Sequence, residues 1–191
     1  MSLTPSNMVP LRTVAKDFEL YDTVSGTYMS LKDIKSDIAT VVMFICNHCP
    51  YVKHVKEELV RISKDYMEQG VAFVGICSND VENYPEDSPD KMRDEAKAWG
   101  YPFPYLYDET QQVARDYDAA CTPDFYLYDK NMELVYRGQL DDSRPGNEKS
   151  LDGKDLRAAL DSAVQGNPVN ENQVPSVGCN IKWKNQDYDM E

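Results

Sequence analysis

The sequence predicts a single α/β domain, in which a central mixed β-sheet is flanked by helices, with an N-terminal β-hairpin and a C-terminal extension. Two continuous apolar segments rich in β-branched residues predict strands covered on both faces. The stretch between them has the apolar period of an amphipathic helix. Further strand and helix patterns follow, and 191 residues correspond to about one domain of ~150 residues with additions.

The N-terminal half is predicted to form a hairpin followed by a parallel βαβ unit. Strand patterns at 18–20 and 27–31 flank a turn that contains glycine. The apolar runs at 40–46 and 71–77 predict the two buried strands, and short joints to the intervening helix favour a right-handed crossover. Apolar residues recur every three or four positions in that helix, at Val52, Val55, Leu59, Ile62 and Tyr66.

The middle of the chain alternates short helices and strands. Residues 78–87 contain four carboxylates and are predicted to form a solvated loop. Ser88 and Pro89 have the residue types of an N-cap and a first helical position, so a helix is expected from there to Trp99. A short strand at 103–107 and a short helix at 110–117 follow.

The C-terminal part is predicted to contain an antiparallel hairpin, a helix and a tail. Strands at 124–128 and 133–139 form the hairpin, and a polar loop at 141–153 precedes a helix at 154–164. The domain core therefore spans about 12–166, and 167–191 is a tail without clear periodicity. Within the tail, 181–183 has the character of a segment that docks on the core or adds a strand.

Composition excludes several classes of function. A net charge of −13 repels phosphate backbones and anionic lipid heads, which argues against binding to nucleic acid or a membrane surface. No apolar run approaches the ~18 residues of a spanning helix. No secretory signal is visible, so we expect a cytoplasmic protein, unless a leader preceded residue 1. Five cysteines are an odd number and do not form the pattern of a disulfide-framed secreted module.

The most informative motif is Cys46-Asn47-His48-Cys49-Pro50, where a buried strand passes into the amphipathic helix. A helix N-terminus carries partial positive charge and unpaired N–H groups, which favour a thiolate over a thiol. Lys53, His48 and His54 add positive charge nearby. Thiols in such CxxC motifs have pKa values of ~3.5 to 7.5, and the two cysteines are spaced to close a disulfide.

The motif has two other interpretations. Cys46 and Cys49 are alternatively small buried packing residues, although the neighbouring histidines favour chemistry. A zinc site needs four ligands, and no second CxxC or histidine pair follows His54. The sequence therefore favours a redox dithiol that requires neither a metal nor an organic cofactor.

A second motif, Cys121-Thr122-Pro123-Asp124, opens the strand at 124–128. The order of hairpin, strand, CxxC, helix and strand, with a later Thr-Pro at the start of a strand, resembles the thioredoxin-fold superfamily. More closely, the sequence is similar to the AhpC/TSA (redoxin) branch and its peroxiredoxin-like group with a "CNHCPYV" motif, over about 12–184. The segments that carry this likeness are 16–20, 30–33, 44–52, 121–129, 137–139 and 179–184.

The resemblance implies thiol–disulfide exchange. Cys46, expected to be the more exposed thiol, would attack a disulfide and Cys49 would resolve the intermediate. The Thr122–Pro123 bond would be cis, with a backbone that pairs with the substrate chain, and His48 would tune the thiolate. The expected partners are thiols or disulfides of proteins or small molecules, and the sequence carries no signal for an oligomeric state.

Departures from relatives leave other functions open. Peroxiredoxins place a threonine three residues before the peroxidatic cysteine, a position held here by Cys46 if Cys49 is that cysteine; Thr122-Pro123 stands near where their arginine would be. Peroxidase activity is therefore the less favoured alternative. Copper-delivery proteins of this fold have three residues between their cysteines, which disfavours metal binding further. Cys121 and Cys179 are candidate additional redox thiols, Arg137 is a candidate rim residue, and Cys77 is interpreted as packing.

Overall fold

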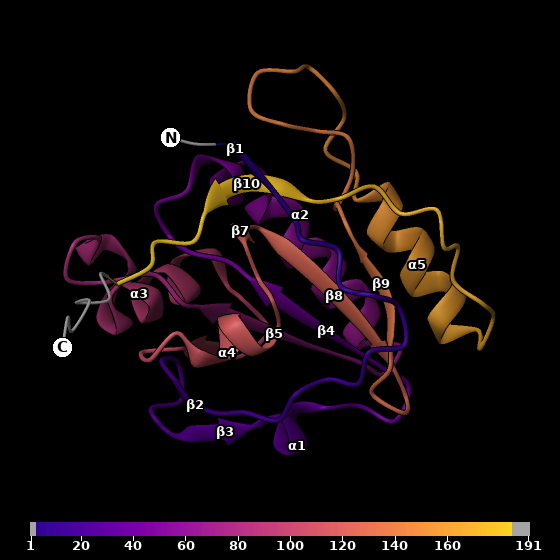
Figure 1. Ribbon diagram of the computed structural model, residues 1–191, viewed down its shortest axis with the longest axis horizontal. Helices are drawn as coiled ribbons and strands as arrows, with labels where there is room; N and C mark the ends of the chain where they lie inside the picture. Colours follow the sequence, from indigo (N-terminus) through magenta and orange to yellow (C-terminus); the bar gives the residue numbers. More distant parts are fainter. Residues whose placement is uncertain (1–2, 185–191) are drawn as a thin grey trace, which may run out of the picture.

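The computed structural model describes residues 3–184, so the end of the predicted tail, 185–191, lies outside the described residues (Figure 1). A seven-stranded mixed sheet forms the centre, in the order β3-β2-β6-β5-β4-β8-β9. Its strands are β2 (Glu19–Asp22), β3 (Tyr28–Ser30), β4 (Ala39–Phe44), β5 (Val71–Cys77), β6 (Tyr105–Tyr107), β8 (Asp124–Asp129) and β9 (Leu134–Gly138).

The central strands have the directions that the sequence predicts. β4 and β5 are parallel and aligned over their full length, as expected for a βαβ unit. β8 runs antiparallel to β4 and pairs antiparallel with β9 across their hairpin. β2 and β3 form the predicted N-terminal hairpin. Leu31, assigned to its second strand, instead begins helix α1 (Leu31–Ile34), because Ser30 and Asp33 form a capping box there.

Helices cover both faces of this sheet. Alternate β4 residues point to opposite sides: Val41 and Met43 join a core with α2 (Pro50–Met67), α3 (Pro89–Trp99) and α5 (Lys154–Val164). Val42 and Phe44 join the other core, with α1 and α4 (Gln112–Asp116). The predicted apolar stripe of α2 is buried throughout. Among the described helices, none is long and apolar enough to cross a membrane.

A second, three-stranded sheet was not predicted. In it β10 (Val177–Asn180) lies between β1 (Leu3–Pro5) and β7 (Cys121–Thr122) and is antiparallel to both. The tail thus contributes a strand slightly before the expected 181–183. Figure 1 shows β10 and β1 crossing one end of the molecule beside α2. This sheet brings β10 next to the Thr-Pro motif, because it pairs with Cys121 and Thr122.

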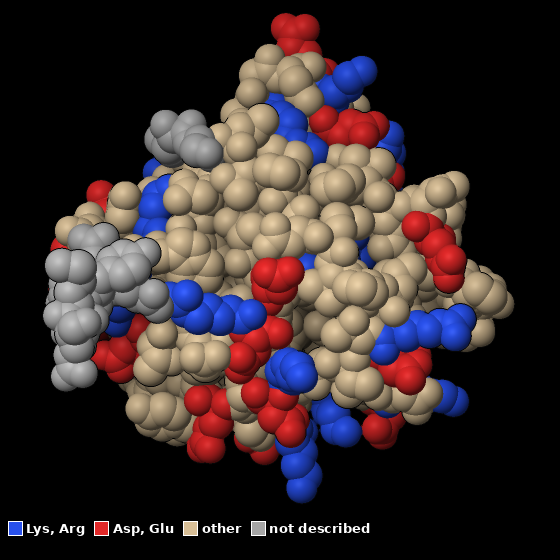
Figure 2. All heavy atoms as spheres, viewed as in Figure 1, with Lys and Arg blue, Asp and Glu red and all other residues tan. Residues whose placement is uncertain are grey.

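The expectation of a solvated loop at 78–87 holds for residues 82–86 but is wrong at both ends of the segment. Ser78, Asn79, Asp80 and Asp87 are all buried, and 85–87 forms a 3₁₀ turn, η1 (Pro85–Asp87), directly before α3. These polar groups are buried because they hydrogen-bond to neighbouring segments. Figure 2 shows charged side chains gathered over β2, β3 and α4, whereas the surface over β10 and β8 is mostly uncharged.

Candidate active site

The two cysteines of the CxxC lie on either side of the turn into α2. Cys49 is the N-cap of the helix and Pro50 its first residue, and Cys46 follows the end of β4. The expected difference in exposure between the two thiols is not seen: Cys46 is 1% and Cys49 0% exposed, so both are buried. Thr122 covers both: its hydroxyl oxygen is 3.5 Å from Cys46 Sγ and its carbonyl oxygen 3.4 Å from Cys49 Sγ.

The environments of the two thiols shift their pKa values in opposite directions. Hydrogen bonding from Cys46 lowers the pKa of Cys49 to about 5, against the effect of burial, with further hydrogen bonds from Cys179 and the Val52 backbone. Burial, together with its hydrogen bond to Cys49, raises the pKa of Cys46 well above its usual range. These surroundings favour ionisation of Cys49 over that of Cys46.

His48 lies beside this pair and is held by a carboxylate. Its Nδ1 hydrogen-bonds to Asp87, and its ring stacks on Tyr84 with centroids 5.2 Å apart. The hydrogen bond with Asp87 raises the pKa of His48, and the Cys49 charge acts in the same direction. By reciprocity, a protonated His48 favours the Cys49 thiolate.

Asp87 is the functional residue that sequence reasoning missed. Its carboxylate is fully buried and accepts hydrogen bonds from the backbone N–H groups of Asn47 (2.8 Å) and His48 (3.2 Å) and from the Asn79 side chain (2.9 Å). Burial opposes its ionisation, but these hydrogen bonds and His48 hold the pKa of Asp87 below its usual value. Asp87 thereby fixes the CxxC loop. A buried acid two residues before a helix start has no local sequence signal.

The Thr-Pro motif faces the cysteines. The Thr122–Pro123 peptide bond is cis. The backbone of Thr122, expected to pair with a substrate chain, is already paired with Cys179 of β10. Cys121 is buried with its Sγ 3.8 Å from the Pro123 carbonyl oxygen, and burial raises the pKa of its thiol far above the usual range, so its surroundings are those of a packing thiol.

Of the remaining residues singled out from the sequence, Cys179 lies at the dithiol and Arg137 does not. Cys179 is brought to the site, with its Sγ 2.7 Å from that of Cys49. Arg137 is not at the rim: it is fully buried and pairs with Asp124 at 3.1 Å. His54 hydrogen-bonds to Ser143 (3.1 Å), and Cys77 is buried at the end of β5, as interpreted from the sequence.

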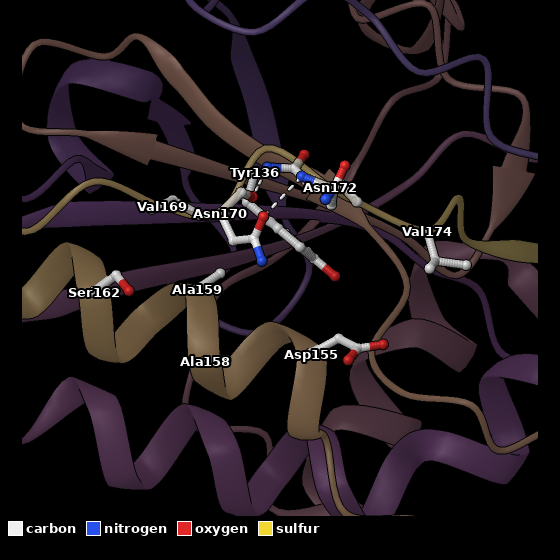
Figure 3. A pocket seen from close by; sticks show the side chains of 10 residues that line it. Tyr136, Asp155, Ala158, Ala159, Ser162, Val169, Asn170, Asn172 and Val174 are labelled. Atoms are coloured by element: carbon white, nitrogen blue, oxygen red, sulfur yellow. Dashed lines mark hydrogen bonds between the residues drawn. The ribbon is translucent and has the colours of Figure 1, made fainter.

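Two cavities lined by the described residues lie near the site or farther away, and no cysteine lines either of them. A pocket of only about 10 Å³ lies next to Pro123, beside Ser176 and Val177. A larger one of about 170 Å³ lies between α5 and the segment 169–174, with Tyr136 at its base, and none of its lining residues is a cysteine (Figure 3). The dithiol is therefore closed in this conformation.

A mixed α/β sheet with a CxxC at the start of the helix after a parallel strand, opposite a cis-proline segment, defines a protein of thioredoxin-like fold. The AhpC/TSA family matches residues 11–137, and the chain belongs to this family. None of the curated proteins matches the sequence.

Solved structures agree with this assignment. The chain is 59% identical to an uncharacterized conserved protein from Geobacillus kaustophilus, with a TM-score of 0.96 over 97% of this chain and 98% of that one. A hypothetical protein from Sinorhizobium meliloti is 50% identical, with a TM-score of 0.92 over 95% and 98%. Peroxidoxin BcpB from Mycobacterium tuberculosis, at 18% identity, shares the fold with a TM-score of 0.60 over 82% and 96%.

The low pKa of Cys49 predicts an unusual thiolate titration. Ultraviolet thiolate absorbance of the reduced protein is expected to rise with a midpoint near pH 5, and Cys46→Ala moves this midpoint upwards because it removes the main stabilising hydrogen bond. Since folding lowers this pKa, the thiolate stabilises the fold fully above the unfolded value of ~8.5, and that contribution is lost as pH falls through about 5. A single rise near 8.5 would contradict the assignment.

His48 is expected to raise the reduction potential of the dithiol. His48→Asn removes the positive charge near the Cys49 thiolate, destabilises the reduced form, and shifts the midpoint by about 10–30 mV to more negative values at pH 7. His54→Asn is the matched control, because His54 bonds to Ser143, and it leaves the potential unchanged. Equal shifts in the two variants would exclude a specific effect of His48.

Proposed function

We propose that the protein is a thiol–disulfide oxidoreductase whose reactive dithiol is Cys46 and Cys49. The observation that carries this proposal is the position of Cys49 as the N-cap residue of α2, where hydrogen bonding from Cys46 lowers the pKa of its thiol to about 5. A protonated neighbour that can be deprotonated later is what the second step of disulfide exchange requires. Membership of a redox family supports the same class of chemistry.

In the proposed mechanism Cys49, not Cys46, attacks first. The Cys49 thiolate attacks one sulfur of a substrate disulfide; that S–S bond breaks, a mixed disulfide forms and the other substrate sulfur leaves as a thiolate that takes up a proton. Cys46 then loses its proton and attacks Cys49 Sγ, which releases the second substrate thiol. Two electrons pass from the dithiol to the substrate, leaving a Cys46–Cys49 disulfide.

His48 and Pro123 have supporting roles in this proposal. His48 stabilises the Cys49 thiolate, and therefore the reduced state, through its charge. Pro123 and Thr122 line the approach to the sulfurs. We propose a single-domain, cytoplasmic protein that acts on disulfides or thiols of proteins or small molecules, without nucleic-acid or membrane partners, a metal or an organic cofactor.

Peroxide reduction is the competing redox activity, and parallel kinetics separate the two. Reduced protein is mixed with oxidised glutathione or with hydrogen peroxide, and loss of thiols is followed by quenched alkylation and mass measurement. The proposal predicts faster reaction with the disulfide and a Cys46–Cys49 product. Faster reaction with peroxide, with sulfenic acid trapped at Cys49, would replace it by a thiol peroxidase.

Metal binding is favoured by one specific observation. Ligand atoms of Cys46, His48 and Asp87 all lie within 4.8 Å of one another. Asp87, however, already binds two backbone N–H groups and an amide, and a closed zinc site needs a fourth ligand. Titration of the reduced protein with zinc, read by competition with a chromophoric chelator, tests this: stoichiometric binding lost in His48→Asn supports a metal site.

A further inference from the structure

Strand β10 pairs with the backbone of residues 120–122, beside the dithiol. In β10, Cys179 is in register with Thr122 and Asn180 with Cys121, and the Ile181 N–H donates to the Ala120 carbonyl at 3.1 Å. The strand thus lies against the segment that leads into Pro123. Any extended substrate that used this backbone edge would take the position that β10 holds.

The sequence is adapted to this close approach at Gly178. A Cβ added there would lie 1.9 Å from the Thr122 carbonyl oxygen and 3.2 Å from Pro123 Cδ. Only glycine allows the two backbones to come so near, since the Thr122 carbonyl is backbone and cannot rotate away. The neighbouring Cys179 is consequently delivered to a defined place.

Cys179 is placed next to the sulfur of Cys49. The two Sγ atoms are 2.7 Å apart, compared with about 2.0 Å in a disulfide bond. Cys179 is 2% exposed, and it comes from a segment 130 positions away in sequence. A substrate sulfur that reacts with Cys49 must arrive at a comparable position.

We propose that Cys179 is a third redox thiol, which forms a disulfide with Cys49 as an alternative to Cys46 and so makes β10 an internal substrate of the active site. This inference rests on the proposed exchange function and extends it. The Cys49–Cys179 disulfide fastens β10 over the dithiol; exchange with a substrate thiol, which is oxidised in turn, reduces this bond and leaves β10 without a covalent link to the site.

The chemistry needs only the oxidant that the proposed function already uses. After Cys49 has formed a mixed disulfide with a substrate, Cys179 loses its proton and attacks Cys49 Sγ; the mixed disulfide breaks and the substrate thiolate leaves and is protonated. The same attack on a Cys46–Cys49 disulfide releases Cys46. Burial and the hydrogen bond to the Cys49 thiolate raise the pKa of Cys179 to about 12. That second effect disappears once Cys49 is in a disulfide.

The test removes Cys46 and asks whether Cys49 still finds a partner. Full-length Cys46→Ser and Cys46→Ala are equilibrated with reduced and oxidised glutathione at graded ratios, alkylated, digested and mapped by mass. Two substitutions are made so that the test can be carried out on either variant that folds, as judged by circular dichroism. We expect a peptide in which Cys49 is joined to Cys179 and a protein that has lost two hydrogens. Cys77→Ser is the matched control, in which Cys46 and Cys49 both remain.

Each outcome decides the inference. A Cys49–glutathione adduct that persists in the folded Cys46 variants, without Cys179 joined to Cys49, would overturn it. Cys179→Ser separates this failure from a failure of the proposed function. If that variant still forms the Cys46–Cys49 disulfide, the exchange function stands and only the role of Cys179 is lost; if neither disulfide forms in any variant, both proposals fail.

Discussion

Cys49→Ser is expected to reduce the rate of exchange with small disulfides by more than about 1,000-fold, to the uncatalysed background. Serine has nearly the same volume, so packing at the N-cap of α2 is kept, while the thiolate with a pKa of about 5 is lost. The measurement is the rate at which the reduced protein releases thiol from bis(2-hydroxyethyl) disulfide, with an excess of dithiol as reductant.

The position of the nucleophile is decided by comparison with two further variants. Cys46→Ser is expected to keep the first attack by Cys49 and then to form the Cys49–Cys179 disulfide, because Cys46 is no longer there to resolve the mixed disulfide. Cys77→Ser, at a buried cysteine that ends β5, retains its activity. If Cys49→Ser instead kept the first reaction and Cys46→Ser lost it, Cys46 would be the attacking thiol, as the sequence suggested.

Arg137→Met is expected to produce the largest loss of stability, about 3 kcal/mol at pH 7. Arg137 and Asp124 are both fully buried, and the guanidinium also stacks over Tyr126 with 4.3 Å between its carbon and the ring centroid. Removal of the cation leaves the Asp124 carboxylate buried without its partner. Unfolding by urea, at several pH values, measures the effect.

The pH dependence of this loss has a defined sign. Burial raises the pKa of Asp124 to about 6 even with Arg137 present. Without Arg137 that pKa rises further above the unfolded value of about 3.9, so the variant loses stability as pH rises through the folded value. The gap from the native protein therefore shrinks at pH 5. A loss below about 0.5 kcal/mol at pH 7, or a change in the dithiol potential, would contradict a purely structural role for Arg137.

Local patterns were enough to predict the central sheet. The apolar runs that became β4 and β5, and the helical period of α2, are properties of neighbouring residues, and short joints restrict how they connect. The same holds for the CxxC, because the strand and helix patterns on either side of it place Cys49 at the start of α2. The fold class and the placement of the CxxC at the start of α2 therefore follow from the sequence.

Contacts between distant segments had no such signal. β1 and β7 both pair with β10, and Leu3 thereby lies opposite Cys179, which is far away in the sequence. Strands of two to four residues are too short for a period to be detected. Asp87 is buried because Asn47 and His48, about 40 positions earlier, donate to it. Burial of Cys46 and the place of Cys179 depend on the same long-range packing, which is why the roles of the thiols were assigned differently from sequence.

The central claim is a reversible dithiol couple at the start of α2, and a glutathione redox titration of the Cys179→Ser protein tests it most directly. That variant contains Cys46 as the neighbouring partner for Cys49, and alkylation with mass mapping identifies each thiol at each potential. The account predicts that Cys46 and Cys49 are oxidised together, as a two-electron couple that forms one intramolecular disulfide. If Cys49 becomes only glutathionylated, or Cys46 stays reduced throughout, the dithiol mechanism is wrong.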